Sequence, residues 1–378
     1  MGPLAGLRIV EMAGIGPGPV CGMLLADLGA EVVVVDRKGA TPLVAESRHD
    51  LTRRGKHSIA LDLKQPGAAE VVLRLIEQAD GLIEGFRPGV MERLGLGPDV
   101  CLARNSRLVY GRLTGWGQHG PLAPAAGHDL NYVALTGILH HTGQRNSAPT
   151  LPATIVGDVG GGAMFMALGL VSGILNARQT GQGQVVDAAI TDGCAVMATL
   201  MHSVRLQGHW SDRRQSNFLD GAAPWYDSYQ CSDGEWVTVG ALEPQFYQLL
   251  LETCGLTGQG LEAAQFDARR WPEGKEKFAA LFRTRTRAEW CELLEGTDVC
   301  FAPVLNLGEA MEHPHNRARQ AYVEIDGVRQ PAPAPRFSAT PGEIGRPPAA
   351  VGADTQHVLE SLGFSNSEAD ELARTGVV

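Results

Sequence analysis

Four consecutive valines occupy positions 32 to 35, between Glu31 and Asp36. An unbroken run of β-branched residues is typical of a strand buried on both faces, which occurs in parallel sheets covered by helices on each side. Strand and helix patterns alternate through residues 1–115, with strands at 7–12, 31–36, 81–86 and 107–114 and helices at 20–28 and 66–79. This alternation predicts an α/β fold with a doubly wound, mostly parallel sheet.

A different pattern begins in the middle of the chain. Residues 226–239 alternate between apolar and polar side chains, and Asp233 and Gly234 are a typical hairpin turn pair, which predicts antiparallel strands. The chain has 378 residues, more than the roughly 250–300 at which a single core stops growing, so we expect two domains. The predicted segments are a smaller α+β domain over about 222–332, an extended proline-rich linker at 330–335 and 340–349, and a final helical pair over 354–374.

Charge and cysteine content exclude several classes of protein. The chain has 32 basic and 42 acidic side chains, a formal net charge of −10, which argues against a nucleic-acid-binding protein. The seven cysteines are widely spaced without a C-x-x-C pair, so we expect a reducing, cytoplasmic location and no disulfide framework. We expect no bound metal, because the histidines at 140, 141, 313 and 315 lack carboxylate or thiolate partners at ligand spacing.

The stretch Val159–Ala177 is uncharged and approaches the length of a transmembrane helix. It contains Ser172, Asn176 and several glycines, and no similar stretch accompanies it, so we expect a buried core helix and no membrane association. The first residues also lack the charged and apolar regions of a signal peptide.

The loop Gly14–Pro19 follows the first predicted strand and Asp36 ends the second, an order also found in nicotinamide-dinucleotide folds. The G-x-G-x-x-G spacing is not met, because its third glycine falls on Pro19 or on Cys21. The prolines of the loop also lack the backbone N–H groups that hold a pyrophosphate. The pattern therefore disfavours dinucleotide binding.

The segment between Asp36 and Lys64 is basic in an otherwise acidic chain. It holds four acidic residues and seven basic ones. The basic residues are Arg37, Lys38, Arg48, Arg53, Arg54, Lys56 and Lys64. Such a segment either binds a polyphosphate or is a solvated loop. Arg37 ends a parallel strand, where open α/β sheets bind ligands, and Arg87 and Arg93 follow the next predicted strand, which favours a ligand.

Two ionisable residues stand beside glycines, His128 in Gly127–Tyr132 and Asp158 in Val156–Gly162. Each has a structural interpretation, since an isolated histidine often only donates a hydrogen bond and an aspartate before a helix is often its N-cap. Each also has a catalytic one. An aspartate that enters an uncharged helix loses solvation, its pKa rises, and amides at the helix start can hold an oxyanion.

Several segments together carry a family resemblance: Gly14–Pro19, Asp36-Arg37, Glu84–Gly89, Thr114–Gly117, Gly127–Tyr132, Gly157-Asp158 and Gly240–Tyr247. The chain resembles the family III CoA-transferase (CaiB/BaiF) superfamily and, within it, the alpha-methylacyl-CoA racemases. The resemblance runs from the first strand to the final helical pair. Its most specific pieces are Gly-His-Asp-Leu-Asn-Tyr at 127–132 and the segment 240–247.

The resemblance implies a Rossmann-like large domain made from both chain ends and a smaller α+β domain. The implied ranges are 1–190 and 333–378 for the large domain, 191–221 for a helical linker and 222–332 for the small domain. It also implies an interlocked homodimer, whose active site lies between the large domain of one subunit and the small domain of the other.

Carried over residue by residue, the resemblance assigns the catalytic acid/base pair to His128 and Asp158, with Glu243 as a hydrogen-bonding partner. Contacts with coenzyme A fall on Arg37, Leu61, Asp62, Leu63, Lys64, Gly85, Phe86, Arg87, Arg93, Gly127, Asp129, Leu130, Asn131 and Tyr132. No separate cofactor is implied, because coenzyme A is part of the acyl-CoA substrate.

The implied reaction interconverts (2R)- and (2S)-2-methylacyl-CoA thioesters. A thioester acidifies its α-proton, so one group removes this proton and the other returns one on the opposite face of the enolate. The first alternative is a CoA-transferase in which Asp158 attacks the thioester as a nucleophile. The second is a non-catalytic acyl-CoA-binding protein, which would bind the thioester without α-proton exchange.

Overall fold

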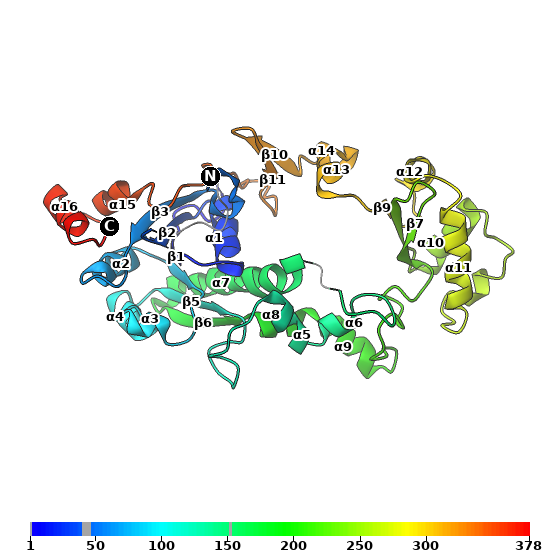
Figure 1. The fold of residues 1–378 in the computed structure, drawn as a ribbon, viewed down its shortest axis with the longest axis horizontal. Helices are drawn as coiled ribbons and strands as arrows, with labels where there is room; N and C mark the ends of the chain where they lie inside the picture. Colours follow the sequence, from blue (N-terminus) through cyan, green and yellow to red (C-terminus); the bar gives the residue numbers. More distant parts are fainter. Residues whose placement is uncertain (1, 40–46, 151–152) are drawn as a thin grey trace. The chain divides into compact units, whose positions relative to one another are not determined.

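The computed structural model describes residues 2–39, 47–150 and 153–378 (Figure 1). The chain divides into two compact units. The large unit comprises Met1–Thr136, Pro152–Met197 and Gln320–Val378, and the small unit comprises Gly137–Leu151 and Ala198–Arg319. The predicted helical linker, residues 191–221, is thus divided between the two units. Residues 320–332, predicted to belong to the small domain, lie in the large unit.

The large unit is built on a six-stranded parallel sheet, as the sequence predicts. Its strands are β1 (Arg8–Met12), β2 (Glu31–Arg37), β3 (Lys56–Leu61), β4 (Gly81–Glu84), β5 (Val109–Thr114) and β6 (Gln184–Ala189), in the order β3-β2-β1-β4-β5-β6. The four valines lie in β2 and are buried. The patterns missed β3 and β6, because Lys56–Ser58 and Gln184–Asp187 include polar residues that do not form an apolar run.

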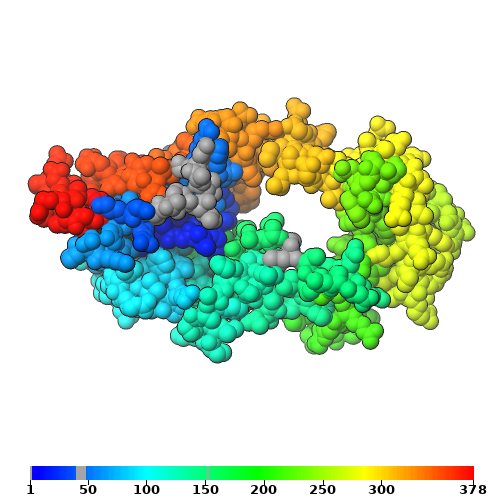
Figure 2. All heavy atoms as spheres, in the orientation of Figure 1, coloured from blue at the N-terminus to red at the C-terminus, as the bar shows by residue number. Residues whose placement is uncertain are grey.

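Helices cover both faces of this sheet. The helices α2 (Ala68–Glu77), α4 (Pro98–Arg104), α15 (Thr355–Ser361) and α16 (Asn366–Arg374) share one hydrophobic core with alternate strand residues such as Val10 and Val33. Figure 2 shows the C-terminal residues (red) against segments from the N-terminal part (blue). The other face meets α1 (Pro17–Asp27) and α7 (Met164–Thr180), since Gly18 approaches Ile83 and Gly81 approaches Leu170. Pro66 precedes α2, whose N-cap is Gly67, and so lies outside the first turn.

The chain leaves the adjacent strands β1 and β4 toward opposite faces. After β1 it enters α1, and after β4 it passes through α3 (Val90–Arg93) into α4. At such a switch point the two loops diverge and leave a crevice at the carboxyl ends of the strands, where open α/β sheets bind ligands.

The segments after β5 complete this edge of the large unit. They are α5 (Asp129–Leu135), a 3₁₀ turn (Ala153–Ile155), a π-helix (Val156–Ala163) that continues into α7, and α8 (Ile190–Met197) after β6. The sequence predicts a buried core helix at 159–177, but α7 is buried on one face only. By length and composition alone, the helical run Ala153–Thr180 is long and apolar enough to cross a membrane. About a third of the apolar 18-residue window within it is buried.

The small unit contains the predicted antiparallel strands β7 (Tyr226–Gln230) and β8 (Trp236–Gly240), joined at Asp233-Gly234, and β9 (Phe301–Pro303) beside β8. Its helices are α6 (Ile138–His141), α9 (Thr199–Leu206), α10 (Pro244–Thr253), α11 (Trp271–Phe282), α12 (Arg287–Leu294), α13 (Leu307–Glu312) and α14 (Pro314–Ala318). Trp225, Phe278, Phe282 and Trp290 pack in its core.

The chain returns to the large unit through a hairpin of β10 (Tyr322–Ile325) and β11 (Val328–Pro331). The predicted linker at 330–335 is therefore partly wrong, because Gln330 and Pro331 pair with β10. The Gln330 side chain is buried and accepts a hydrogen bond from Arg54, so this segment is fastened to the large unit.

Candidate active site

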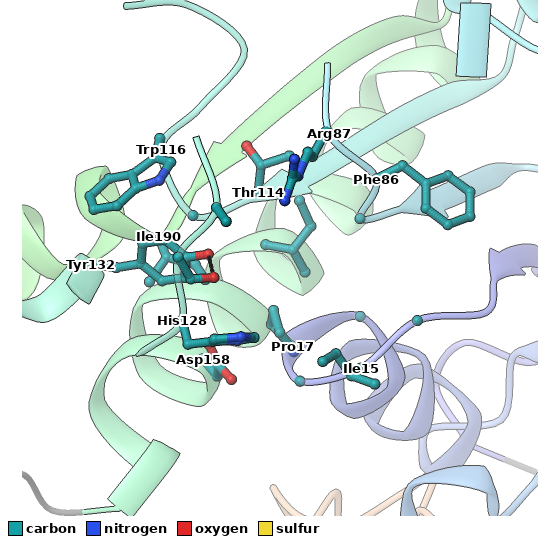
Figure 3. Close-up of a pocket in the computed structure, with 18 of the residues that line it drawn as sticks. Ile15, Pro17, Phe86, Arg87, Thr114, Trp116, His128, Tyr132, Asp158 and Ile190 are labelled. Atoms are coloured by element: carbon teal, nitrogen blue, oxygen red, sulfur yellow. Dashed lines mark hydrogen bonds between the residues drawn. The ribbon is translucent and has the colours of Figure 1, made fainter. Parts of the chain in front are cut away.

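A pocket of about 450 Å³ opens at the carboxyl ends of β1, β4 and β5, entirely within the large unit (Figure 3). Its walls are the loop Gly14–Pro19 after β1, Gly85–Pro88 after β4, Leu113–Trp116 at the end of β5, and the segment before α5 that ends at His128. Tyr132, Asp158 and Ile190 complete the lining. The pocket therefore lies at the topological switch point of the sheet.

The glycine loop after β1 reaches the Asp158 carboxyl. Gly16 has φ +72°, and a Cβ atom there would lie 2.7 Å from Asp158 Oδ2. Glycine is thus needed both for the backbone conformation and for the close approach. The close approach of this loop to Asp158 explains why the loop contains Gly16, and dinucleotide binding is not needed to explain it.

Asp158 lies inside the π-helix Val156–Ala163, whose N-cap is Ile155, so the N-cap interpretation of Asp158 is wrong. Its backbone N–H donates to Asp129 Oδ2 at 2.6 Å. Burial, followed by the negative charge of Asp129, raises the pKa of the Asp158 carboxyl to about 6, and His128 opposes the shift. At pH 7 the carboxyl is therefore mostly ionised, but about a tenth of it carries a proton, far more than for an ordinary aspartate.

His128 is the N-cap residue of α5 and its imidazole is exposed to the pocket. Its backbone N–H donates to Asn131 Oδ1 at 3.0 Å, so Asn131 fixes the start of the helix. Figure 3 shows the His128 and Asp158 side chains next to each other, on the side of the pocket that faces Pro17. The structure thus brings together two proton-transfer groups that are thirty positions apart in the chain.

Trp116 and Tyr132 form an aromatic wall opposite the glycine loop, with ring centroids 4.7 Å apart in an edge-to-face arrangement. The Tyr132 hydroxyl donates to the Gly127 carbonyl. A Cβ atom at Gly115 would lie 1.9 Å from the Tyr132 ring, and one at Gly127 would lie 2.7 Å from it. Sequence reasoning did not assign Trp116 to the site, although the segment Thr114–Gly117 carries part of the family resemblance.

The loop after β4 is held by a buried carboxylate. Glu84 is fully buried, accepts the Phe86 backbone N–H at 2.9 Å and pairs with Arg112 at 3.0 Å. Burial raises the pKa of Glu84 to about 7, although these hydrogen bonds oppose the shift. The carboxylate orients Gly85, Phe86 and Arg87, all of which line the pocket, and the exposed Arg87 acts electrostatically on Tyr132.

Three side chains of the basic segment are not available to a ligand. Arg54 pairs with Asp27 at 2.5 Å, Arg53 with Asp36 at 2.6 Å and Lys56 with Glu11 at 2.6 Å, all inside the large unit. The surplus of positive charge available on the surface is therefore smaller than predicted, because these three basic side chains pair with buried carboxylates. Arg37 and Lys64 remain exposed at the carboxyl ends of β2 and β3.

The remaining predicted contact residues lie in different surroundings. Leu61 is in the core, Asp62 accepts the Lys64 backbone N–H, and Leu63 packs against the core. Arg93 and Leu130 are exposed, whereas Asp129 is buried and does not line the pocket.

Glu243 lies in the small unit, as the exposed N-cap residue of α10. In the part of the chain that the structure describes, no group of three or more His, Cys, Asp or Glu side chains could hold a metal ion.

Comparison with known proteins places the chain in a family. Residues 4–355 match CoA-transferase family III. The alpha-methylacyl-CoA racemase of Mus musculus is 44% identical over 99% of this chain and 97% of that protein, and the racemase of the same name from Homo sapiens is 42% identical over 98% and 96%. The crystal structure of a CAIB/BAIF family protein from Brucella suis has a TM-score of 0.82 and 25% identity and covers 96% of this chain and 99% of that one. The chain therefore belongs to CoA-transferase family III.

Proposed function

We propose that this chain is a racemase that interconverts (2R)- and (2S)-2-methylacyl-CoA thioesters through an enolate. The observation that carries the proposal is the pair His128 and Asp158, two different proton-transfer groups that line one pocket, with the pKa of Asp158 raised to about 6. Its full-length similarity to two alpha-methylacyl-CoA racemases supports the same reaction.

For one epimer, neutral His128 removes the α-proton and protonated Asp158 returns a proton to the opposite face. For the other epimer the two roles are exchanged. The active form of the pair therefore carries one proton in total, and the rate should pass through a maximum between the two macroscopic pKa values. Only a proton moves, so the reaction requires no cofactor beyond the coenzyme A that is part of the substrate.

The enolate oxygen needs hydrogen-bond donors. The Asp158 amide is not available, because it already donates to Asp129. The oxyanion role is therefore assigned to the other amides near Asp158, at the start of the π-helix.

Recognition of coenzyme A is assigned to the exposed residues at the carboxyl ends of the strands, namely Arg37, Lys64, Gly85–Arg87 and Arg93, together with Gly127 and Tyr132. A guanidinium can stack on adenine and form a paired hydrogen bond with phosphate, which suits Arg37 and Arg87. Asn131 and Asp129 contribute indirectly, through the capping of α5 and the backbone of Asp158.

Replacing Arg37 by alanine should raise KM for acyl-CoA about tenfold and leave kcat nearly unchanged, because the interaction is equally strong in ground and transition states. Steady-state kinetics with one 2-methylacyl-CoA measures both parameters. Arg107→Ala is the matched control, since Arg107 is also exposed but lies just before β5, at the opposite edge of the sheet. An unchanged KM for Arg37→Ala would remove Arg37 from the binding site.

The proposal includes a homodimer in which Glu243 of one chain supports the acid/base pair of the other. An exposed apolar stripe on α7 supports association: Met164, Leu168, Val171 and Leu175 are 53%, 64%, 37% and 60% exposed and recur at helical spacing. The opposite face of α7 packs closely on β5 and β6, where Gly169 approaches Val186 and Gly173 approaches Val109.

Placing a charge in this stripe should dissociate the dimer. We expect Leu168→Glu to sediment as a monomer at micromolar concentration, whereas the wild type sediments as a dimer, because a buried glutamate would lack a partner. Gln179→Glu, at the exposed polar end of α7, should leave the dimer intact. A wild-type monomer, or a dimer of Leu168→Glu, would exclude this face as the interface.

The cytoplasmic location remains part of the proposal and is supported by the seven cysteines, all of which are free thiols.

The transferase alternative rests on one observation, that the Asp158 carboxyl lies in the pocket and could attack a thioester. One experiment separates the two reactions. The protein is incubated in deuterated buffer with one epimer of a 2-methylacyl-CoA and no acceptor acid, and deuterium at Cα and the epimer ratio are followed. Incorporation with appearance of the other epimer supports the racemase. CoA transfer that requires an added carboxylic acid, without exchange, identifies a transferase, and binding with neither reaction identifies a non-catalytic protein.

A further inference from the structure

Asp129 follows His128 directly and is the first residue of α5. Asp129 is only 3% exposed, and it is not part of the pocket lining. A buried carboxylate in this position is poorly placed to contact coenzyme A. Its environment therefore has to explain why a charged residue is present.

The Asp129 carboxylate contacts the backbone of Asp158. Its Oδ2 atom accepts the Asp158 N–H at 2.6 Å. A Cβ atom at Gly157 would lie 2.4 Å from the same oxygen and 3.0 Å from Val133 Cγ2. The contact is possible only because residue 157 is a glycine, so the carboxylate fixes the Gly157–Asp158 peptide at the start of the π-helix.

The charge of Asp129 is incompletely compensated. Its Oδ1 atom is buried and has no hydrogen-bond partner among the described residues. The titratable groups that act on Asp158 are His128, Asp129 and Tyr132 from the α5 segment and Cys194 from α8. Burial raises the pKa of both Tyr132 and Cys194, so these two are neutral near pH 7. The negative charge facing Asp158 is thus that of Asp129.

We propose that Asp129 is a positioning residue, whose buried carboxylate holds the backbone of Asp158 and keeps a negative charge beside its carboxyl group without touching the substrate. The inference rests on the proposed function, because it gives Asp129 a role in that proton transfer. The neighbouring charge disfavours the ionised form of Asp158, so Asp158 retains its proton to higher pH. The fixed peptide aims the carboxyl group at the pocket.

Two substitutions separate the hydrogen bond from the charge. Asp129→Asn keeps the shape and an acceptor for the Asp158 N–H but removes the charge. We expect the acid limb of its pH profile of kcat/KM to move to lower pH by about one unit, with KM within twofold of the wild type. Asp129→Ala also removes the acceptor and should lower kcat at least tenfold at unchanged KM. Asp370→Asn, an exposed aspartate on α16, is the control for loss of one negative charge.

Two results would overturn the inference: an Asp129→Asn profile that coincides with the wild type, or a raised KM at constant kcat, which would make Asp129 a coenzyme A contact. A titration that needs no turnover separates this failure from that of the proposed function. Carboxyl ¹³C NMR of the full-length protein, with the Asp158 signal identified by its loss in Asp158→Asn, should show a lower pKa of Asp158 in Asp129→Asn. If the wild type exchanges no deuterium, the racemase proposal fails, and an unchanged titration would still refute the inference about Asp129.

Discussion

His128→Ala should lower the rate of epimer interconversion by about 10³-fold, because inversion needs a proton donor on one face of the enolate and an acceptor on the other. The variant retains Asp158, so we expect it to exchange the α-proton of the epimer whose proton faces Asp158, without inversion. Asp158→Asn should show the mirror image, with exchange confined to the other epimer. The measurement is α-deuterium incorporation from each pure epimer, with the epimer ratio followed by chromatography.

The control for this experiment is His357→Ala, which removes an exposed imidazole on α15 outside the pocket lining and should retain wild-type exchange. If both active-site variants lost exchange from the same epimer, the two groups would not lie on opposite faces of the substrate. If His128→Ala inverted both epimers at the wild-type rate, His128 would not be a catalytic residue.

Lys56→Met should destabilise the protein by about 3–5 kcal/mol, the cost of leaving a buried charge without its partner. Lys56 and Glu11 are each 1% exposed, and their charged atoms lie 2.6 Å apart. Lys56 also donates to the Pro19 carbonyl at 2.8 Å, at the start of α1. A Cβ atom at Gly22 would lie 1.9 Å from Glu11 Oε2, so the pair sits directly beneath α1.

The loss should depend on pH. Burial already raises the pKa of Glu11 against the opposing effect of Lys56, and removing Lys56 raises it further. A carboxyl whose folded pKa exceeds its unfolded value near 4.5 binds more protons in the folded state, so the free energy of unfolding falls as pH rises above that value. Lys56→Met should therefore be more stable at pH 5 than at pH 8.

Urea unfolding of both proteins at these two pH values measures the effect. Adding Glu11→Leu to Lys56→Met should restore much of the lost stability, because an apolar pair can replace a buried ion pair. Lys277→Met, which breaks an ion pair with the exposed Glu273, is the matched control and should change stability little. A Lys56→Met protein as stable as the wild type at pH 8 would show that the buried pair does not hold this edge of the large unit together.

Local patterns in the sequence predicted the elements whose signal is carried by neighbouring residues. The valine run identifies β2, the turn pair Asp233-Gly234 identifies the hairpin of β7 and β8, and apolar spacing identifies α2, since each depends on periodicities of two or about 3.6 residues. The residues named as an acid/base pair, His128 and Asp158, lie in one pocket. The family resemblance contributed this pairing, because no local pattern relates two positions thirty residues apart.

The sequence alone thus determined the parallel α/β architecture, the antiparallel hairpin and the terminal helices, because burial imposes a repeating pattern on each strand and helix. The tertiary structure alone decided the partners of the charges. Arg53, Arg54 and Lys56 form a basic cluster in the sequence, but folding pairs them with Asp36, Asp27 and Glu11, and it likewise places Asp129 beneath Asp158. A single charged residue is not part of a repeating pattern in the sequence. Whether it faces solvent, a ligand or a buried partner depends on which distant segments pack against it when the core forms.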